Sequence, residues 1–135
     1  MNAMFADTAG WLCLADAKEP HHTAACSARD GWLRQGGIFV STDYVIDETL
    51  TLIRLRLGLT AAFKWWEQVE RSSRVRWEWM SPMRLDKAQR WFFQWKDKQF
   101  SFTDCTSFVV MRELRLGVAL TTDRHFQMAG FEIVP

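Results

Sequence analysis

The sequence predicts an α/β fold, a three-layer sandwich in which a mainly parallel central sheet is flanked by helices. Short apolar runs typical of buried strands alternate along the chain with longer segments of helical periodicity, and this alternation favours a parallel sheet. The length of 135 residues suits one domain, and 48% hydrophobic residues suffice for a packed core. We therefore expect a single domain covering residues 1–135.

The first part of the chain predicts two strands and two helices. The apolar run 3–6 stops at Asp7 and is typical of a buried strand. The helical segment that follows is broken at Glu19-Pro20, and the next is closed by Gly36-Gly37. The predicted order is strand 3–6, helix 8–17, helix 21–35 and strand 38–40.

The remainder predicts four helices and three strands. Residues 41–43 offer helix caps, Gly58 ends the helix that they start, and Pro82 stands at a favoured first helical position. Residues 75–80 alternate with period two, as in a half-buried strand. The predicted order is helix 43–57, helix 61–71, strand 75–80, helix 82–98, a helix from 103 to 117, strand 118–121 and strand 131–134.

Charge and cysteine content exclude several classes of protein. The formal net charge is +1, but residues 51–100 hold eleven basic and five acidic residues, so the middle is basic and the ends are acidic. Three cysteines without C-x-x-C spacing disfavour a disulfide scaffold or a Cys-based zinc site. No secretory signal or membrane-length apolar run is found, so we expect a cytoplasmic protein without a membrane partner.

Three aspartates stand where predicted strands end or helices begin. Asp7 follows the first strand, Asp123 closely follows strand 118–121, and Asp104 opens a helix. Ligands of open α/β sheets bind beyond the carboxyl ends of the strands, so these side chains can project into one crevice. Each aspartate taken alone is also explained as a helix cap.

Glu48 is the one charged residue in a row on the helix 43–57. Tyr44, Glu48, Leu52 and Leu55 share a face by their spacing, whereas Asp47 lies on a polar stripe. A buried lone carboxylate costs several kcal/mol unless it is paired or binds a metal. Glu48 therefore either joins Asp7 at the rim of the sheet or reaches solvent without a role.

Four carboxylates gathered at one rim would repel one another without a cation between them. Hard oxygen ligands suit Mg²⁺ or Mn²⁺ better than zinc. A site of this kind can activate water and stabilise a phosphoryl transition state. Asp7, Glu48, Asp104 and Asp123 are thus candidate metal ligands and catalytic residues of a phosphodiesterase.

Four segments of the chain together resemble the PIN-domain nucleases, in particular the VapC-like toxins of bacterial toxin–antitoxin modules. PIN domains place an Asp after the first strand, a Glu on a following helix and two Asp late in the chain, and Asp7, Glu48, Asp104 and Asp123 match this order. The segments are Phe5-Ala6-Asp7-Thr8-Ala9-Gly10-Trp11, Asp43-Tyr44-Val45-Ile46-Asp47-Glu48-Thr49-Leu50, Phe102-Thr103-Asp104-Cys105-Thr106-Ser107-Phe108 and Leu120-Thr121-Thr122-Asp123-Arg124-His125-Phe126.

The resemblance implies a metal-dependent endoribonuclease that uses Mg²⁺ or Mn²⁺ to hydrolyse RNA. It also implies a cognate antitoxin protein and a homodimer, and it gives Thr8, with Thr122 as a second candidate, a supporting role beside the carboxylates. A housekeeping PIN nuclease fits the same residues. The alternative is a catalytically silent PIN-like module that acts by binding RNA or protein.

The basic middle of the chain has two interpretations. Phosphates are contacted by Arg and Lys and unpaired bases stack on aromatic rings, so the segment could contact RNA. It could equally be a solvated face over an aromatic core, and most of the tryptophans favour a core or a protein interface. The residues concerned are Arg71, Arg74, Arg76, Arg84, Lys87, Arg90, Lys96 and Lys98, among Trp65, Trp66, Trp77, Trp79, Trp91 and Trp95.

Overall fold

The fold is built on a five-stranded sheet in which every paired neighbour is parallel. A computed structural model describes residues 2–135 of the chain, and the strand order is β3-β2-β1-β4-β5. The strands are β1 (Ala3–Ala6), β2 (Ile38–Thr42), β3 (Val75–Glu78), β4 (Val118–Leu120) and β5 (Glu132–Val134). The helices are α1 (Thr8–Ala15), α2 (His22–Arg34), α3 (Asp43–Leu57), α4 (Leu59–Arg71), α5 (Pro82–Gln94), α6 (Phe102–Glu113) and α7 (His125–Met128).

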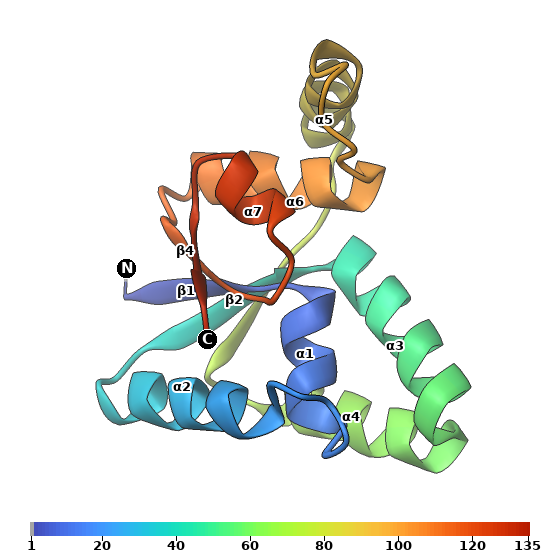
Figure 1. Cartoon of the computed structure of the whole chain (residues 1–135), viewed down its shortest axis with the longest axis vertical. Helices are drawn as coiled ribbons and strands as arrows, with labels where there is room; N and C mark the ends of the chain where they lie inside the picture. Colours follow the sequence, from blue (N-terminus) through green and yellow to red (C-terminus); the bar gives the residue numbers. More distant parts are fainter. Residues whose placement is uncertain (1) are drawn as a thin grey trace.

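The helices form a layer on each side of the sheet. In Figure 1, α1 to α4 lie below the sheet and α5, α6 and α7 lie above it. This confirms the predicted three-layer sandwich, and the sheet is more uniformly parallel than expected. Within residues 2–135, no helix combines the length and the apolar character needed to cross a bilayer.

The order of the strands creates a crevice between β1 and β4. The chain leaves β1 through α1 and α2 to reach β2 on one side, and it enters β4 from α5 and α6 on the other side. Because these connections lie on opposite faces of the sheet, the carboxyl ends of β1 and β4 diverge into a binding crevice. Asp7 follows β1 directly, and Asp123 follows β4 after two residues.

The helix that carries Asp104 is fixed by a capping box and by burial. The Ser101 hydroxyl accepts a hydrogen bond from the Asp104 backbone N–H, and the Asp104 carboxylate accepts one from the Ser101 N–H. All residues of α6 from Asp104 to Met111 are buried, including the fully covered Phe108. Such reciprocal capping fixes where a helix begins, so the two hydrogen bonds hold Asp104 in the first turn of α6.

Several predicted element boundaries were wrong, and one short helix was not predicted. Strand 75–80 ends at Glu78, and the helix from 103 ends at Glu113 rather than at Gly117. The helix expected over 82–98 ends at Gln94, and the backbone of Trp95 is no longer helical. No Gly or Pro stands near this point, so no local signal marks the end. The short helix α7 was not predicted because four residues carry no measurable periodicity.

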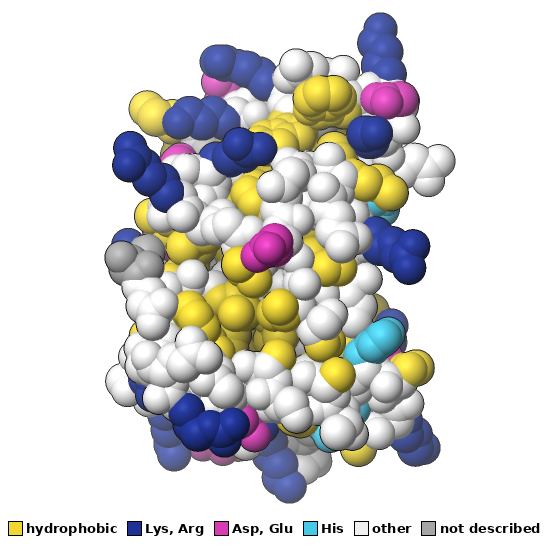
Figure 2. All heavy atoms as spheres, turned by 60° about the vertical axis from the view of Figure 1, so that its left-hand side comes forward, with side chains coloured by type: hydrophobic (Ala, Val, Ile, Leu, Met, Phe, Trp, Pro, Cys, Tyr) yellow, Lys and Arg dark blue, Asp and Glu magenta, His cyan; other side chains and the backbone are white. Residues whose placement is uncertain are grey.

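Large apolar side chains remain exposed in two regions of the surface. At the α3–α4 junction these are Leu55, Leu59 and Phe63, each at least 60% exposed. Around α5 they are Trp79, Met83, Phe92, Phe93 and Trp95. In the face drawn in Figure 2, hydrophobic side chains run down the middle while Lys and Arg lie mostly around the margin, many of them toward the end where α5 lies.

Candidate active site

Asp7 is the most deeply buried carboxylate of the crevice. Its side chain is 4% exposed, and it accepts hydrogen bonds from the Thr121 hydroxyl, at 2.9 Å, and from the backbone N–H of Thr8. Burial raises the pKa of Asp7 to about 7, with a further increase from the negative charges of Asp104 and Asp123. The two hydrogen bonds oppose this increase because they stabilise the charged form.

Asp104 shares this environment from the opposite side of the crevice. Burial first, and then the charge of Asp123, raise the pKa of Asp104 to about 6. The hydrogen bonds from Ser101 and the nearby His125 act in the opposite direction. Two acidic groups with raised pKa values in one crevice identify it as a candidate functional site.

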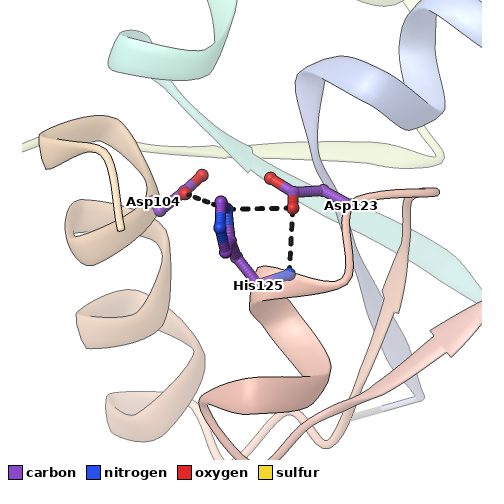
Figure 3. A group of neighbouring side chains, drawn as sticks. All are labelled: Asp104, Asp123 and His125. Carbon is purple, nitrogen blue, oxygen red and sulfur yellow. Dashed lines mark hydrogen bonds and ion pairs between the residues drawn. The ribbon is translucent and has the colours of Figure 1, made fainter. Parts of the chain in front are cut away.

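Asp123 and His125 complete a compact group with Asp104 (Figure 3). The Asp123 Oδ1 atom accepts a hydrogen bond from the His125 backbone N–H at 2.9 Å and lies 3.1 Å from His125 Nδ1. The same ring nitrogen lies 3.4 Å from Asp104 Oδ2. Each of the three residues offers a ligand atom within 4.8 Å of the others.

Glu48 lies on α3, which packs against α1, the helix after Asp7, and against α6, the helix that carries Asp104. One turn earlier, the Tyr44 ring packs 6.4 Å from the ring of Phe102, two residues before Asp104. One residue later, the Thr49 hydroxyl donates a hydrogen bond of 3.3 Å to the hydroxyl of Thr8, next to Asp7. The Glu48 side chain is half-buried and makes no hydrogen bond or ion pair within residues 2–135.

The three threonines around the crevice make different contacts. Thr8 is buried, its backbone contacts Asp7 and its hydroxyl accepts from Thr49. The side chain of Thr122, the second candidate, interacts with the thiol of Cys13. The hydroxyl that reaches Asp7 belongs to Thr121, which also accepts a hydrogen bond of 3.0 Å from the Asp123 N–H.

Neither Thr121 nor His125 is among the site residues predicted from the sequence. Thr121 reaches Asp7 because Ala6 pairs with Leu120 in the sheet, so the residues after them are neighbours. The available signal was the position of Thr121 directly after a strand, but the register that makes it useful is not local. His125 lay two residues after a candidate ligand, which was the only sequence signal for it.

The donor set fits a hard divalent cation. The crevice gathers three carboxylates, and the two with raised pKa values gain from any positive charge placed between them. Carboxylate oxygens are the ligands that Mg²⁺ and Mn²⁺ prefer, and a neutral imidazole nitrogen is compatible with Mn²⁺. The cluster is therefore a potential acidic metal-binding group.

Part of the basic middle of the chain has a structural role. Arg74 donates hydrogen bonds to the carbonyls of Gly37 and Leu33, and Arg84 pairs with Glu78 at 2.8 Å and with Glu113 at 3.0 Å. Arg74 thus connects the start of β3 to the end of α2 and the start of β2, and Arg84 connects the start of α5 to the ends of β3 and α6. Trp11 and Trp65 are core residues, 5% and 6% exposed, whereas Trp79 and Trp95 are exposed.

Comparison with known proteins gives similarity over nearly the whole chain. A Mycobacterium tuberculosis protein, the 23S rRNA-specific endonuclease VapC20, is 30% identical over 128 residues, which cover 95% of each chain. The crystal structure of VapC20, described as a sarcin–ricin loop cleaving toxin, matches with a TM-score of 0.86 over 98% of this chain and 99% of that one. FitAcB from Neisseria gonorrhoeae, at 12% identity, shares the fold with a TM-score of 0.65 over 98% and 96% of the two chains. No protein-family model matches the chain.

Fold, crevice and similarity together define the class of protein. A parallel sheet between two helical layers, with carboxylates at the β1–β4 crevice, is the architecture of the PIN-domain nucleases. Within that class the chain belongs to the VapC-like toxins, the endoribonucleases of toxin–antitoxin systems.

Proposed function

We propose that this chain hydrolyses RNA phosphodiester bonds with a divalent cation, Mg²⁺ or Mn²⁺, held by Asp7, Glu48, Asp104 and Asp123. The observation that carries the proposal is the shared crevice of Asp7, Asp104 and Asp123, in which burial and mutual repulsion raise the pKa of two carboxylates. Such an arrangement is costly for a fold and is explained by a cation that offsets it.

The residues of the crevice have separate roles in this proposal. Asp7, Asp104 and Asp123 bind the cation, and Glu48 approaches from α3 as the fourth carboxylate. Thr121 and the Thr8 backbone orient Asp7 and favour its charged form. When bound, the cation offsets negative charge at the phosphoryl group and makes water a better nucleophile near neutral pH.

The substrate we propose is ribosomal RNA of the large subunit. The relative VapC20 is named as an endonuclease specific for 23S rRNA, and the similarity covers 95% of both chains. The nuclease would meet this RNA in the cytoplasm. If this chain has a different target from VapC20, we expect cleavage of tRNA instead, and the cleavage assay described below includes tRNA for this reason.

Protein partners are the second part of the proposal. The apolar residues exposed at the α3–α4 junction, together with Trp79, Met83, Phe92 and Phe93 around α5, form patches rather than scattered single side chains, and such patches mark interaction sites. We propose that they contact a second copy of the chain and a cognate antitoxin. The antitoxin would inhibit cleavage by covering the acidic crevice. Size measurement of the purified chain tests the homodimer separately.

Cleavage of purified ribosomal RNA and tRNA, in separate reactions with Mg²⁺, Mn²⁺ or EDTA, tests the activity. Asp104→Asn removes one charge but little volume, and it should lose cleavage by at least about 100-fold while keeping its fold. Asp47→Asn, on the exposed side of α3, is the matched control and should cut like the wild type. Folded, antitoxin-free protein that cuts neither RNA with any metal would favour the silent binding module instead.

A further inference from the structure

A second hollow opens beside the acidic crevice, between the end of α5 and the end of α7. We call it the α5–α7 pocket; its volume is about 400 Å³. The residues that characterise it are Trp91, Trp95, Lys98, Phe100, Arg112 and Met128. It exists because α5 ends at Gln94, which frees Trp95 and Lys98 from the helix.

The α5–α7 pocket and the acidic crevice share a wall. The ring of Phe100, which lines the pocket, meets the His125 ring edge-on at 5.8 Å between centroids. On its other side, His125 lies 3.1 Å from Asp123 and 3.4 Å from Asp104. A polynucleotide with a phosphodiester at the carboxylates would therefore pass the pocket with a neighbouring nucleotide.

The charges of the pocket favour an anionic ligand. Among the residues that the structure describes, Lys98 and Arg112 are the charged lining residues of the pocket, and none of its lining residues is acidic. Lys98 pairs only with the exposed Asp97, at 3.5 Å, within the described chain. Arg112 lies over the rings of Trp91 and Phe131 and donates to the Ala129 carbonyl, which leaves further guanidinium N–H groups for a ligand.

The aromatic lining favours a planar ligand. Trp95 is 44% exposed and lines the pocket, so one large ring is available for stacking. A second pocket, lined by Tyr44, Phe92 and Phe93, differs in charge, because Asp86 is the one charged residue that lines it within residues 2–135. An aromatic surface beside two cations matches a nucleotide, whereas an aromatic surface beside an acid does not.

We propose that the α5–α7 pocket binds one unpaired nucleotide of the RNA substrate, next to the bond that is cut. Trp95 stacks on the base, and Lys98 and Arg112 contact its phosphate. This inference rests on the proposed ribonuclease function, for which it supplies a specificity-determining subsite. Such a subsite favours RNA in which a base beside the cleaved bond is unstacked.

Binding of a fluorescent single-stranded RNA oligonucleotide in EDTA, measured by anisotropy, tests the subsite without cleavage. Trp95→Ala should raise Kd by about 5- to 100-fold, and Trp95→Phe should restore most of the affinity because the ring can still stack. Lys98→Met should weaken binding and reduce the slope of log K against log salt by about 0.7. Lys96→Met, in the same exposed loop but outside the pocket, is the matched control and should change neither quantity appreciably.

Cleavage kinetics separate this inference from the proposed function. Trp95→Ala and Lys98→Met should raise KM with kcat within about twofold of the wild type, because neither residue contacts the carboxylates. If the wild type cuts RNA but both pocket variants bind and cut as it does, or if Lys96→Met weakens binding as much as Lys98→Met, the subsite is wrong. A wild type that cuts nothing, while Trp95→Ala still loses RNA affinity, would refute the ribonuclease proposal and retain the pocket as an RNA site.

Discussion

The Thr121 hydroxyl donates a 2.9 Å hydrogen bond to the Asp7 carboxylate, joining the ends of β4 and β1 across 114 positions of the chain. The same oxygen accepts from the Asp123 N–H at 3.0 Å. One side chain therefore orients two of the proposed metal ligands. It also limits how far burial raises the pKa of Asp7.

Replacing Thr121 by Val should shift the pH dependence of cleavage. The change removes a hydrogen bond to the charged form of Asp7, so its pKa rises further and the acid limb of kcat/KM moves to higher pH. From the strength of a hydrogen bond to a charged group, we expect kcat/KM at pH 7 to fall roughly 10- to 100-fold. Part of this activity should return at pH 9, where Asp7 is ionised. Thr122→Val is the control, since that side chain interacts with Cys13. An unmoved acid limb in Thr121→Val would contradict this role.

Affinity for the divalent cation should rise steeply between pH 5.5 and pH 8. In the metal-free protein the pKa values of Asp7 and Asp104 are about 7 and about 6, so protons compete with the cation below neutrality. Calorimetric titration with Mn²⁺ should show at least tenfold weaker binding at pH 5.5 than at pH 8, with proton release near pH 6.5. Affinity that is independent of pH over this range would show that neither aspartate binds the ion.

Removing a charge from the crevice should stabilise the metal-free protein at high pH. Asp104 has a folded-state pKa above its ordinary value of 3.8, so the folded state binds its proton more tightly and the free energy of unfolding falls as pH rises from about 4 to about 6. In EDTA at pH 8, Asp104→Asn should therefore have a free energy of unfolding higher than the wild type by on the order of 1–3 kcal/mol, since one pK unit corresponds to about 1.4 kcal/mol. This difference should appear as a Tm several degrees higher.

Two further conditions test the origin of that stabilisation. At pH 4.5 the advantage of Asp104→Asn should shrink, because the wild-type carboxyl is then largely protonated in the folded state. Saturating Mn²⁺ at pH 8 should reverse the order by stabilising the wild type more. A variant less stable than the wild type in EDTA at pH 8 would show that lost hydrogen bonds outweigh charge repulsion.

Gly10 fixes the distance between α1 and β4. A Cβ atom at this position would lie 2.1 Å from the Leu120 carbonyl oxygen, so Gly10→Ala must push α1 away from the sheet beside Asp7 and Thr121. We expect a loss of at least about 2–3 kcal/mol in the free energy of unfolding, measured in urea. Gly31→Ala in α2 meets no atom within 4 Å and should stabilise the protein by about 0.5–1 kcal/mol. Equal stability of the two variants would contradict the close approach.

The layers of the fold and the positions of three aspartates were predictable from local sequence patterns. Strand 3–6 and the helix after it were predictable because a short apolar run and a polar stop at Asp7 are local signals. The same reasoning placed Asp104 at a helix start and Asp123 after a strand, and parallel strands bring such ends to one edge.

The contacts that these residues make depend on how the layers pack against one another. The pairing of Ala6 with Leu120 sets Thr121, not Thr122, against Asp7, and strand register depends on partners over a hundred residues apart. The end of α5 at Gln94, which opens the α5–α7 pocket, depends likewise on packing rather than on a local stop signal. Local patterns record which backbone a segment prefers, whereas contacts between distant side chains arise only when the layers pack, so the sequence identified the carboxylates and the fold supplied their environment.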